Sequence, residues 1–239
     1  MLPRFVGRLG LADAVTVANA AIGFLAVVVA FSDVRLAARL LLLAAVLDGL
    51  DGVLARRYGG TPVGPHLDSL ADVASFTVAP AVLAFVVVTD GFEIDLASTT
   101  PELLGVGAVC ALFVAMGVTR LGLYTAYDTA EEWTEGVQTT LAATILGAAV
   151  LAGVTDPWVI LGGTAAFCYL MVSRIQYPDL LARDALLMGV VHVLAILIPD
   201  FAGRTFPYAL LTLGLAYLVL GPLFYWRGGT LLARVYGNA

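Results

Sequence analysis

Four aspartates stand out because they lie in or beside apolar stretches long enough to cross a membrane. Asp48 and Asp51 lie near the end of one apolar stretch, and Asp68 and Asp72 lie near the start of the next. A charged side chain inside a membrane-spanning helix costs about 2.5–3.5 kcal/mol on insertion scales and usually has a functional role. Four such groups close together therefore predict a functional site rather than a feature of helix packing.

The spacing of these aspartates predicts that their carboxylates converge. Asp48 and Asp51 are three residues apart and Asp68 and Asp72 are four apart, so each pair shares one face of a helix. The short connection at residues 57–66 makes the two helices antiparallel neighbours. Converging carboxylates repel each other in a low dielectric unless cations lie between them or some are protonated. An all-oxygen ligand set suits Mg²⁺, Mn²⁺ or Ca²⁺, and paired ions of this kind serve phosphoryl chemistry.

Neighbouring residues could bind a phosphate or nucleotide beside the carboxylates. Arg56 offers a guanidinium fork that matches phosphate geometry. Gly52 and Ala55 lie on nearly the same helix face as the first aspartate pair and leave room for a ligand or a partner helix. Gly60 and Gly64 allow the backbone of the connecting loop to approach a ligand closely.

The amino-acid composition indicates which class of protein carries this site. Of 239 residues, 61% are apolar and only 13% are charged, against about 25% charged in an average soluble domain. The apolar residues occur in long blocks, which are typical of transmembrane helices. These features exclude a soluble globular domain, a disordered chain, a disulfide-rich module and a nucleic-acid-binding protein.

The apolar blocks predict an all-α polytopic membrane helical bundle of about eight transmembrane helices in a single domain, residues 1–239. Polar residues, proline and glycine separate the blocks, as turn chemistry requires. The expected spans are residues 14–31, 36–57, 67–89, 103–126, 137–154, 157–176, 184–199 and 207–226.

An even number of spans places both termini on one side of the membrane, and the arginines then set the orientation. One side holds nine arginines and the other three, so the first side should be cytoplasmic, with the site facing it in a multi-pass cell-membrane protein. The nine are Arg4, Arg8, Arg56, Arg57, Arg120, Arg174, Arg183, Arg227 and Arg234, and the three are Arg35, Arg39 and Arg204.

The stretch from Asp48 to Asp72 resembles the signature of the CDP-alcohol phosphatidyltransferases. It reads Asp-Gly-Leu-Asp-Gly-Val-Leu-Ala-Arg, then seven residues, then Gly-Pro-His-Leu-Asp-Ser-Leu-Ala-Asp. The family signature is DxxDGxxAR followed by GxxxDxxxD, and all eight of its fixed positions are matched. The resemblance implies a membrane enzyme with at least six helices around a polar cavity that opens to the cytoplasm.

The resemblance also implies roles for single residues. Asp48, Asp51, Asp68 and Asp72 would bind divalent metal, Mg²⁺ or Mn²⁺ and two ions in all, which hold the pyrophosphate of a CDP-lipid substrate. Asp72 is similar to the position assigned as general base for the acceptor alcohol. The remaining signature positions, Gly52, Ala55, Arg56 and Gly64, would make room for the cytidine nucleotide or contact its phosphates. A homodimer among membrane lipids, with no nucleic-acid partner, is the expected assembly.

Shorter motifs indicate L-serine as the acceptor. The segment from Met171 to Pro178 is similar to the MVS…YP segment of phosphatidylserine synthases, and Thr16, Asn19 and Gly23 follow the pattern of their first helix. Val118-Thr119-Arg120-Leu121 is similar to the arginine-containing end of their fourth helix. The similarity ends after Arg120, where that family often continues with Arg-Phe-Asn and this chain has Gly-Leu-Tyr.

These motifs contain four further candidate binding residues. Arg120 and Arg174 could bind the serine carboxylate or a phosphate, although arginines near helix ends commonly extend to lipid phosphates instead. Thr16 and Asn19 could reach the nucleotide from the first helix, and hydrogen bonding between helices is the alternative.

Other functions stay open on the sequence alone. Within the same family the acceptor could be glycerol phosphate or inositol phosphate. In a different class, the aspartates could form the cation pathway of a coupled transporter, although the internal repeats of such proteins are not evident. All twelve basic residues are arginine against eighteen acids. This pattern favours a high-salt organism, or simple codon bias; in a haloarchaeon the lipid would be CDP-archaeol and the transferred group archaetidyl.

Overall fold

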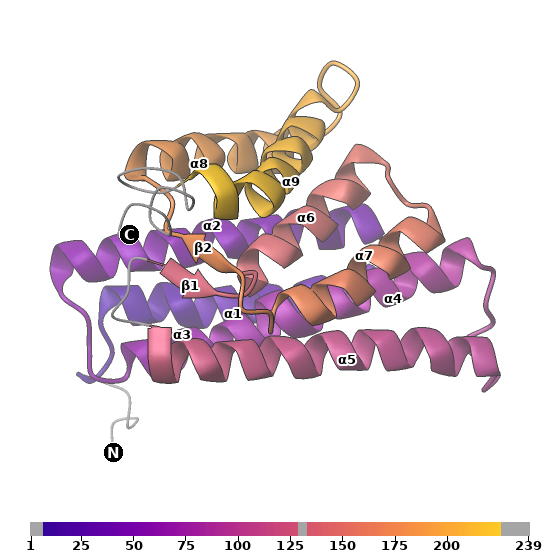
Figure 1. Cartoon of the computed structure of the whole chain (residues 1–239), viewed down its shortest axis with the longest axis horizontal. Helices are drawn as coiled ribbons and strands as arrows, with labels where there is room; N and C mark the ends of the chain where they lie inside the picture. Colours follow the sequence, from indigo (N-terminus) through magenta and orange to yellow (C-terminus); the bar gives the residue numbers. More distant parts are fainter. Residues whose placement is uncertain (1–6, 129–132, 226–239) are drawn as a thin grey trace, which may run out of the picture.

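The computed structural model describes residues 7–128 and 133–225, and helices dominate it (Figure 1). The α-helices are α1 Leu11–Ala30, α2 Val34–Tyr58, α3 Gly64–Asp72, α4 Ala79–Gly91, α5 Pro101–Leu123, α6 Thr139–Ala152, α7 Pro157–Leu170, α8 Ala182–Leu197 and α9 Thr205–Phe224. Two π-helical turns, η1 Val73–Val78 and η2 Tyr124–Asp128, and two strands, β1 Trp133–Glu135 and β2 Gln176–Pro178, complete the described part.

The π-helical turns join or extend α-helices. The nine α-helices of the described part therefore form fewer than nine continuous helical rods. The turn η1 connects α3 and α4 into one helical stretch from Gly64 to Gly91, and η2 continues α5. Within the described residues the chain therefore forms eight helical rods, one at each position where an apolar block predicts a span. This confirms the all-α class.

Four rods are long and apolar enough to cross a membrane by length and composition. They are Leu11–Ala30, Gly64–Gly91, Pro101–Tyr127 and Thr205–Phe224, and α6 and α7 are shorter apolar helices. The chain is thus a helical membrane protein, while the count of eight spans remains a prediction. Three of the arginines used for the orientation, Arg4, Arg227 and Arg234, lie outside the described residues.

The expected span at residues 157–176 is wrong at its C-terminal end. The helix α7 ends at Leu170, and the chain then turns into β2, which pairs antiparallel with β1 so that Tyr177 faces Thr134. Gly136 permits this arrangement, because it has φ +76° and a Cβ there would lie 2.1 Å from the Met171 carbonyl oxygen. The strand pair thus holds the segment after α5 against the segment after α7 (Figure 1).

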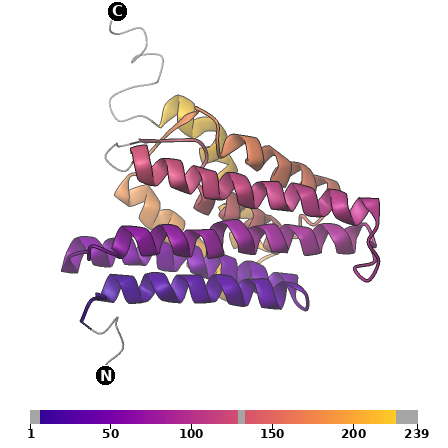
Figure 2. The ribbon, with the colours of Figure 1, turned by 90° about the horizontal axis from the view of Figure 1, so that it is seen from below.

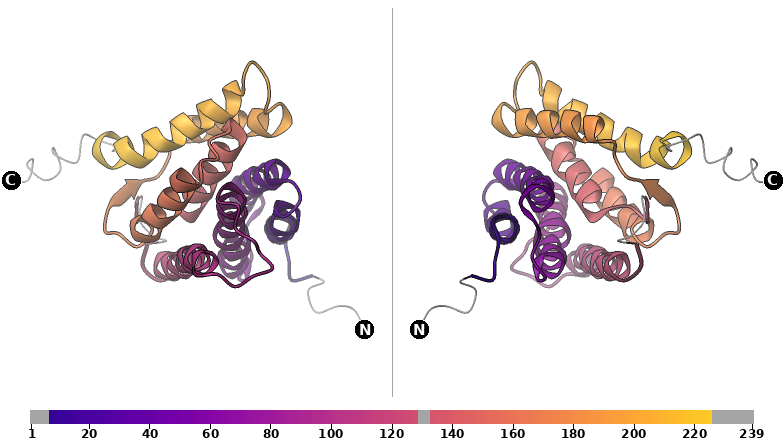
Figure 3. Two further views of the ribbon diagram at one scale, coloured as in Figure 1. Left: turned by 90° about the vertical axis from the view of Figure 1, so that its right-hand side faces the viewer. Right: turned by 90° about the vertical axis from the view of Figure 1, so that its left-hand side faces the viewer.

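Helix α6 forms the centre of the bundle, because nearly all of its side chains are buried. The helix α9 packs against α6, and α8 packs against α2 and α9, so that α8 and α9 form an outer layer in the end-on views of Figure 3. On the opposite side, the rod of α3, η1 and α4 lies between α1 and α5 (Figure 2). Close contact between α1 and η1 requires Gly23, where a Cβ would lie 2.4 Å from Ser75 Oγ.

Candidate metal and nucleotide site

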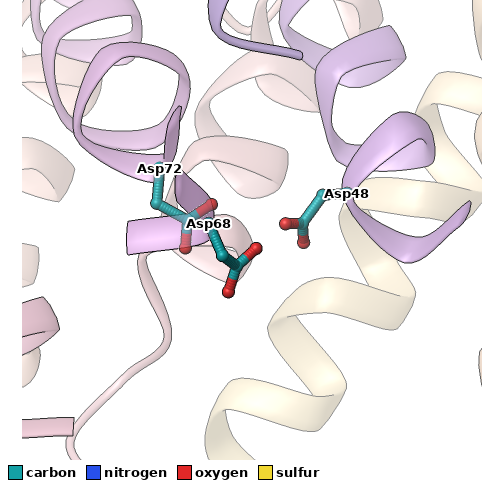
Figure 4. Close-up of side chains that lie close together, drawn as sticks. All are labelled: Asp48, Asp68 and Asp72. Atoms are coloured by element: carbon teal, nitrogen blue, oxygen red, sulfur yellow. The ribbon is translucent and has the colours of Figure 1, made fainter. Parts of the chain in front are cut away.

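Three of the four predicted aspartates meet in one place. Asp48 extends from α2, and Asp68 and Asp72 extend from α3, with one carboxylate oxygen of each within 4.8 Å of the others. Figure 4 shows the three carboxylates directed toward a shared space between the two helices. All three side chains are half-buried, so water screens their negative charges less than at an open surface.

The chemistry of this cluster fits a divalent cation. Asp72 Oδ1 is buried and accepts no hydrogen bond from any residue that the structure describes. A buried polar atom without a partner is costly, and carboxylates in contact repel one another. A hard cation with oxygen ligands would remove both costs at once. The donor set therefore fits Mg²⁺, Mn²⁺ or Ca²⁺ and offers no thiolate or imidazole ligand among the three.

Asp51 is oriented differently from the three-carboxylate cluster. Its side chain is 6% exposed, and its Oδ2 accepts a hydrogen bond of 2.6 Å from Thr16 Oγ1 on α1. Three residues along an α-helix fall short of a full turn by about 60°, which directs Asp51 toward α1 while Asp48 faces the cluster. A role for Asp51 as a metal ligand stays a prediction.

A cavity of about 330 Å³ adjoins the cluster, and we call it the polar cavity because aspartate, threonine and serine side chains are part of its lining. Six residues predicted from the sequence to bind metal or nucleotide line it together: Thr16, Asp51, Gly52, Ala55, Gly64 and Asp68. Small residues on α2 and the N-terminal end of α3 leave the space, and three aspartates, Asp13, Asp51 and Asp68, give it negative charge. This arrangement is suited to a nucleotide whose phosphates reach the metal ligands.

The polar cavity also has lining residues that the sequence analysis missed. They include Asp13 and Thr61 near the start of α1 and before α3, and Tyr124 and Thr125 in η2. Ser69 is another, and its hydroxyl lies 3.0 Å from that of Thr125, which connects α3 to the end of α5. An acid in the first turn of a helix is common as a cap, so Asp13 gave no signal in the sequence.

A second, mostly apolar cavity of about 790 Å³ lies between α2, α6 and α8. Asp48 and Arg56 line it, and apolar side chains such as Leu141, Leu186 and Val190 form most of its wall. The carboxylate cluster therefore stands between a polar cavity and an apolar one. A molecule with a polar nucleotide and a lipid portion could extend into both.

Arg120 lies beside the cluster, in a position fixed by its neighbours. Its side chain is 6% exposed and its guanidinium donates a 2.9 Å hydrogen bond to Thr134 Oγ1 of β1. The guanidinium also lies 5.0 Å from the ring centroid of Tyr124, and it attracts the carboxylate of Asp72 electrostatically. The strand β1, unforeseen in the sequence, thus holds a cation next to the carboxylates.

Four predicted residues line neither of the two cavities: Asp72 and Arg120, described above, and Arg174 and Asn19. Arg174 is exposed in the segment between α7 and β2, and it lines neither of the two cavities described above. Asn19 is fully buried in α1 and also lines neither cavity. Its backbone carbonyl accepts a hydrogen bond from Ser75 Oγ, so Asn19 lies at the contact between α1 and η1.

Comparison with known proteins identifies the family of the chain. A model of the CDP-alcohol phosphatidyltransferase family matches residues 9–196, which include the carboxylate cluster and the polar cavity. The chain is 30% identical to the archaetidylserine synthase of Methanothermobacter thermautotrophicus over 71% of this chain and 70% of that protein. It is 29% identical to the CDP-diacylglycerol–serine O-phosphatidyltransferase of Bacillus subtilis over 69% of this chain and 87% of that protein.

Because the family match covers most of the chain and every fixed position of the family signature is present, the protein belongs to the CDP-alcohol phosphatidyltransferase family.

Proposed function

We propose that this chain is a single catalytic domain that transfers a phosphatidyl or archaetidyl group from a CDP-linked lipid to the hydroxyl of L-serine, with release of CMP. The observation that carries the proposal is the meeting of Asp48, Asp68 and Asp72 beside the cavity lined by the signature residues. The serine acceptor is supported by the names of the relatives and by the motifs around Arg120 and Met171.

The cluster would hold Mg²⁺ or Mn²⁺, with Asp48, Asp68 and Asp72 as ligands and Asp51 completing a site for two ions. The bound ions would neutralise the pyrophosphate of the CDP-lipid and stabilise the charge that develops at the attacked phosphorus. Gly52, Ala55 and Gly64 leave the space that the nucleotide requires. Arg56, at the edge of the apolar cavity, would pair with a phosphate through its guanidinium fork.

Asp72 would act as the general base. The pKa of a serine hydroxyl lies far above 7, so attack by its oxygen needs a positioned group that takes its proton. The proton passes to Asp72 while the serine oxygen bonds to the lipid-side phosphorus. The bond from that phosphorus to the CMP oxygen breaks, and CMP leaves with the electron pair. Since Asp72 is also a proposed metal ligand, its two oxygens would divide these tasks.

Arg120 would bind the carboxylate of the serine substrate. Its guanidinium is buried beside Asp72 and held by Thr134, so fixing its orientation on a bound carboxylate would cost little further conformational entropy. Arg174 would take part only if the exposed segment that contains it closes over the site. Thr16 would act through Asp51, and Asn19 would support the first helix beside the nucleotide.

The active site would face the cytoplasm of a multi-pass protein in the cell membrane, with membrane lipids around it. The excess of arginines at this end of the helices supports that orientation. The resemblance to the family suggests a homodimer.

The direct test uses purified protein, CDP-linked lipid and a set of acceptors, with and without Mn²⁺. CMP release with L-serine, and little with glycerol phosphate or inositol phosphate, is the expected result. CMP release with another acceptor in place of serine would overturn the serine assignment. Cation flux in vesicles without any CMP release would point to a transporter and overturn the proposal as a whole. Parallel assays with diacylglycerol and archaeol donors identify which lipid is used.

A further inference from the structure

The helix α9 holds the strand β2 through two reciprocal hydrogen bonds. Tyr217 Oη on α9 donates to the Pro178 carbonyl oxygen at 2.5 Å, and Tyr177 Oη on β2 donates to the Leu218 carbonyl oxygen at 3.2 Å. Two adjacent residues of the strand thus bind two adjacent residues of the helix. Both tyrosine side chains are buried, so water competes little for either bond.

A third tyrosine extends this contact to the start of α8. Tyr225 Oη accepts a 3.0 Å hydrogen bond from the Leu181 backbone N–H and donates one to the carboxylate of Asp184. The ring centroids of Tyr217 and Tyr225 lie 5.9 Å apart in an edge-to-face arrangement, and those of Tyr177 and Tyr217 lie 6.1 Å apart. Such ring pairs add to the packing energy. We call Tyr177, Tyr217 and Tyr225 the tyrosine cluster.

The strand that α9 holds is paired with the strand that supports Arg120. Tyr177 of β2 lies opposite Thr134 of β1 in the antiparallel pair. Thr134 Oγ1 accepts the 2.9 Å hydrogen bond from the Arg120 guanidinium. A continuous path of contacts therefore leads from Tyr217 on α9, through both strands, to the cation beside the carboxylate cluster.

The family signature does not include this path. The family model matches residues 9–196, whereas α9 begins at Thr205. The segment that resembles phosphatidylserine synthases ends at Tyr177 and Pro178, and these are the two residues that α9 holds. The tyrosine cluster therefore gives that motif a structural connection to a helix outside the matched region.

We propose that Tyr217 is a positioning residue for the acceptor site, because its hydroxyl holds β2 and thereby fixes the direction in which Arg120 meets the serine carboxylate. The inference rests on the proposed function, in particular on Arg120 as the group that binds the acceptor. Without the hydroxyl, one end of the strand pair is held less firmly, and serine binding has to restrict more motion, which lowers affinity. The competing explanation is that the tyrosine cluster only stabilises the fold.

The test removes one hydroxyl group and measures the two substrates separately, from CMP release by the purified full-length protein. In Tyr217→Phe the KM for L-serine should rise by about twofold to tenfold, the range that the loss of one neutral hydrogen bond allows. The KM for the CDP-lipid and kcat should stay near their wild-type values. A wild-type KM for serine would overturn the inference, and so would an equal rise in both KM values, which would assign Tyr217 to the lipid.

Tyr208→Phe is the matched control. Tyr208 lies on the same helix, is exposed and lines neither of the two cavities. The same loss of a hydroxyl there should leave both KM values unchanged. A rise in the KM for serine as large as that in Tyr217→Phe would show that any hydroxyl loss on α9 has this effect, which would contradict the inference.

A double variant tests whether Tyr217 acts through β1. Residues that act along one path have effects that do not add. Thr134→Val cuts the path at Arg120, so adding Tyr217→Phe to it should raise the KM for serine by less than about twofold further. Two independent effects that multiply in the double variant would overturn the proposed path.

Tyr177→Phe covers the case in which Tyr217→Phe does not fold. It removes the reciprocal bond to the Leu218 carbonyl and should raise the KM for L-serine in the same way. A wild-type KM for serine in this variant would contradict the inference. Absence of CMP release with L-serine by the wild type would instead refute the proposed function, on which the inference rests.

Discussion

Thr16 on α1 donates a hydrogen bond of 2.6 Å to Asp51 Oδ2 on α2, although the two residues lie 35 positions apart in the chain. Both side chains are buried, so the bond is protected from competing water. The first helix therefore does more than cross the membrane. It holds one carboxylate of the signature in a fixed direction at the edge of the polar cavity.

Replacing Thr16 with valine should weaken catalysis through Asp51. The variant keeps the β-branched shape but leaves a buried carboxylate without its donor, which costs about 1–3 kcal/mol. We expect kcat/KM for the CDP-lipid to fall by roughly tenfold to hundredfold, and the Mn²⁺ concentration for half-maximal rate to rise. Thr16→Ser keeps the hydroxyl and should stay near the wild type. Equal rates in Thr16→Val and the wild type would show that Asp51 needs no such support.

Asp72→Asn should separate chemistry from binding. The amide has nearly the same shape but cannot take the serine proton, and general-base catalysis typically contributes 10²–10⁴-fold. We expect kcat to fall by at least about 100-fold while the affinity for CDP-lipid, measured by equilibrium binding, changes little. Asp48→Ala should instead weaken metal binding. Wild-type turnover in Asp72→Asn would remove the base assignment, and wild-type Mn²⁺ affinity in Asp48→Ala would count against that ligand.

Arg120→Gln tests the acceptor site. Removing a buried cation that binds the serine carboxylate should cost about 1.5–3 kcal/mol, which raises the KM for L-serine by roughly tenfold to hundredfold. The KM for the CDP-lipid should change much less. Thr134→Val, which removes the hydrogen bond to Arg120 but keeps its charge, should produce a smaller change in the same direction. An unaltered KM for serine in Arg120→Gln would assign the residue a structural role.

Gly136→Ala tests the strand pair that supports Arg120. The left-handed backbone alone would cost about 1–2 kcal/mol with a side chain, and the Cβ would also overlap the Met171 carbonyl oxygen. We expect a lower Tm in detergent and reduced activity. Gly105→Ala is the control, because a Cβ there meets nothing within 4 Å and alanine favours the helix. If both variants melted at the wild-type temperature, the close approach at Gly136 would be unimportant for stability.

The helices could be predicted because long apolar runs are a strong signal, and each run corresponds to a rod in the described structure. The short strands and the π-helical turns could not be predicted from the sequence. The strands β1 and β2 are three residues each and join segments more than 40 residues apart. Strands this short have no periodic sequence pattern that would predict them. The π-helical turns after Asp72 and Leu123 likewise depend on packing between helices.

The sequence predicted which residues form the site, but it did not predict that Asp51 is oriented differently from the other three aspartates. The signature placed Asp48, Asp68 and Asp72 together correctly as neighbours. It could not show that Asp51 turns toward Thr16, because that requires the position of α1 relative to α2. Asp13 was missed for the same reason, since its contacts with Thr61 and Gly64 depend on tertiary structure.

The measurement that tests the central claim most directly is CMP release from CDP-lipid and L-serine as a function of free Mn²⁺, with purified protein first stripped by a chelator. If carboxylates from α2 and α3 share bound cations, release should be absent in the stripped protein and should rise to saturation as Mn²⁺ is restored. The Asp68→Asn variant should need far more Mn²⁺ for the same rate. Full CMP release by the stripped protein, at the same rate in Asp68→Asn, would contradict the account.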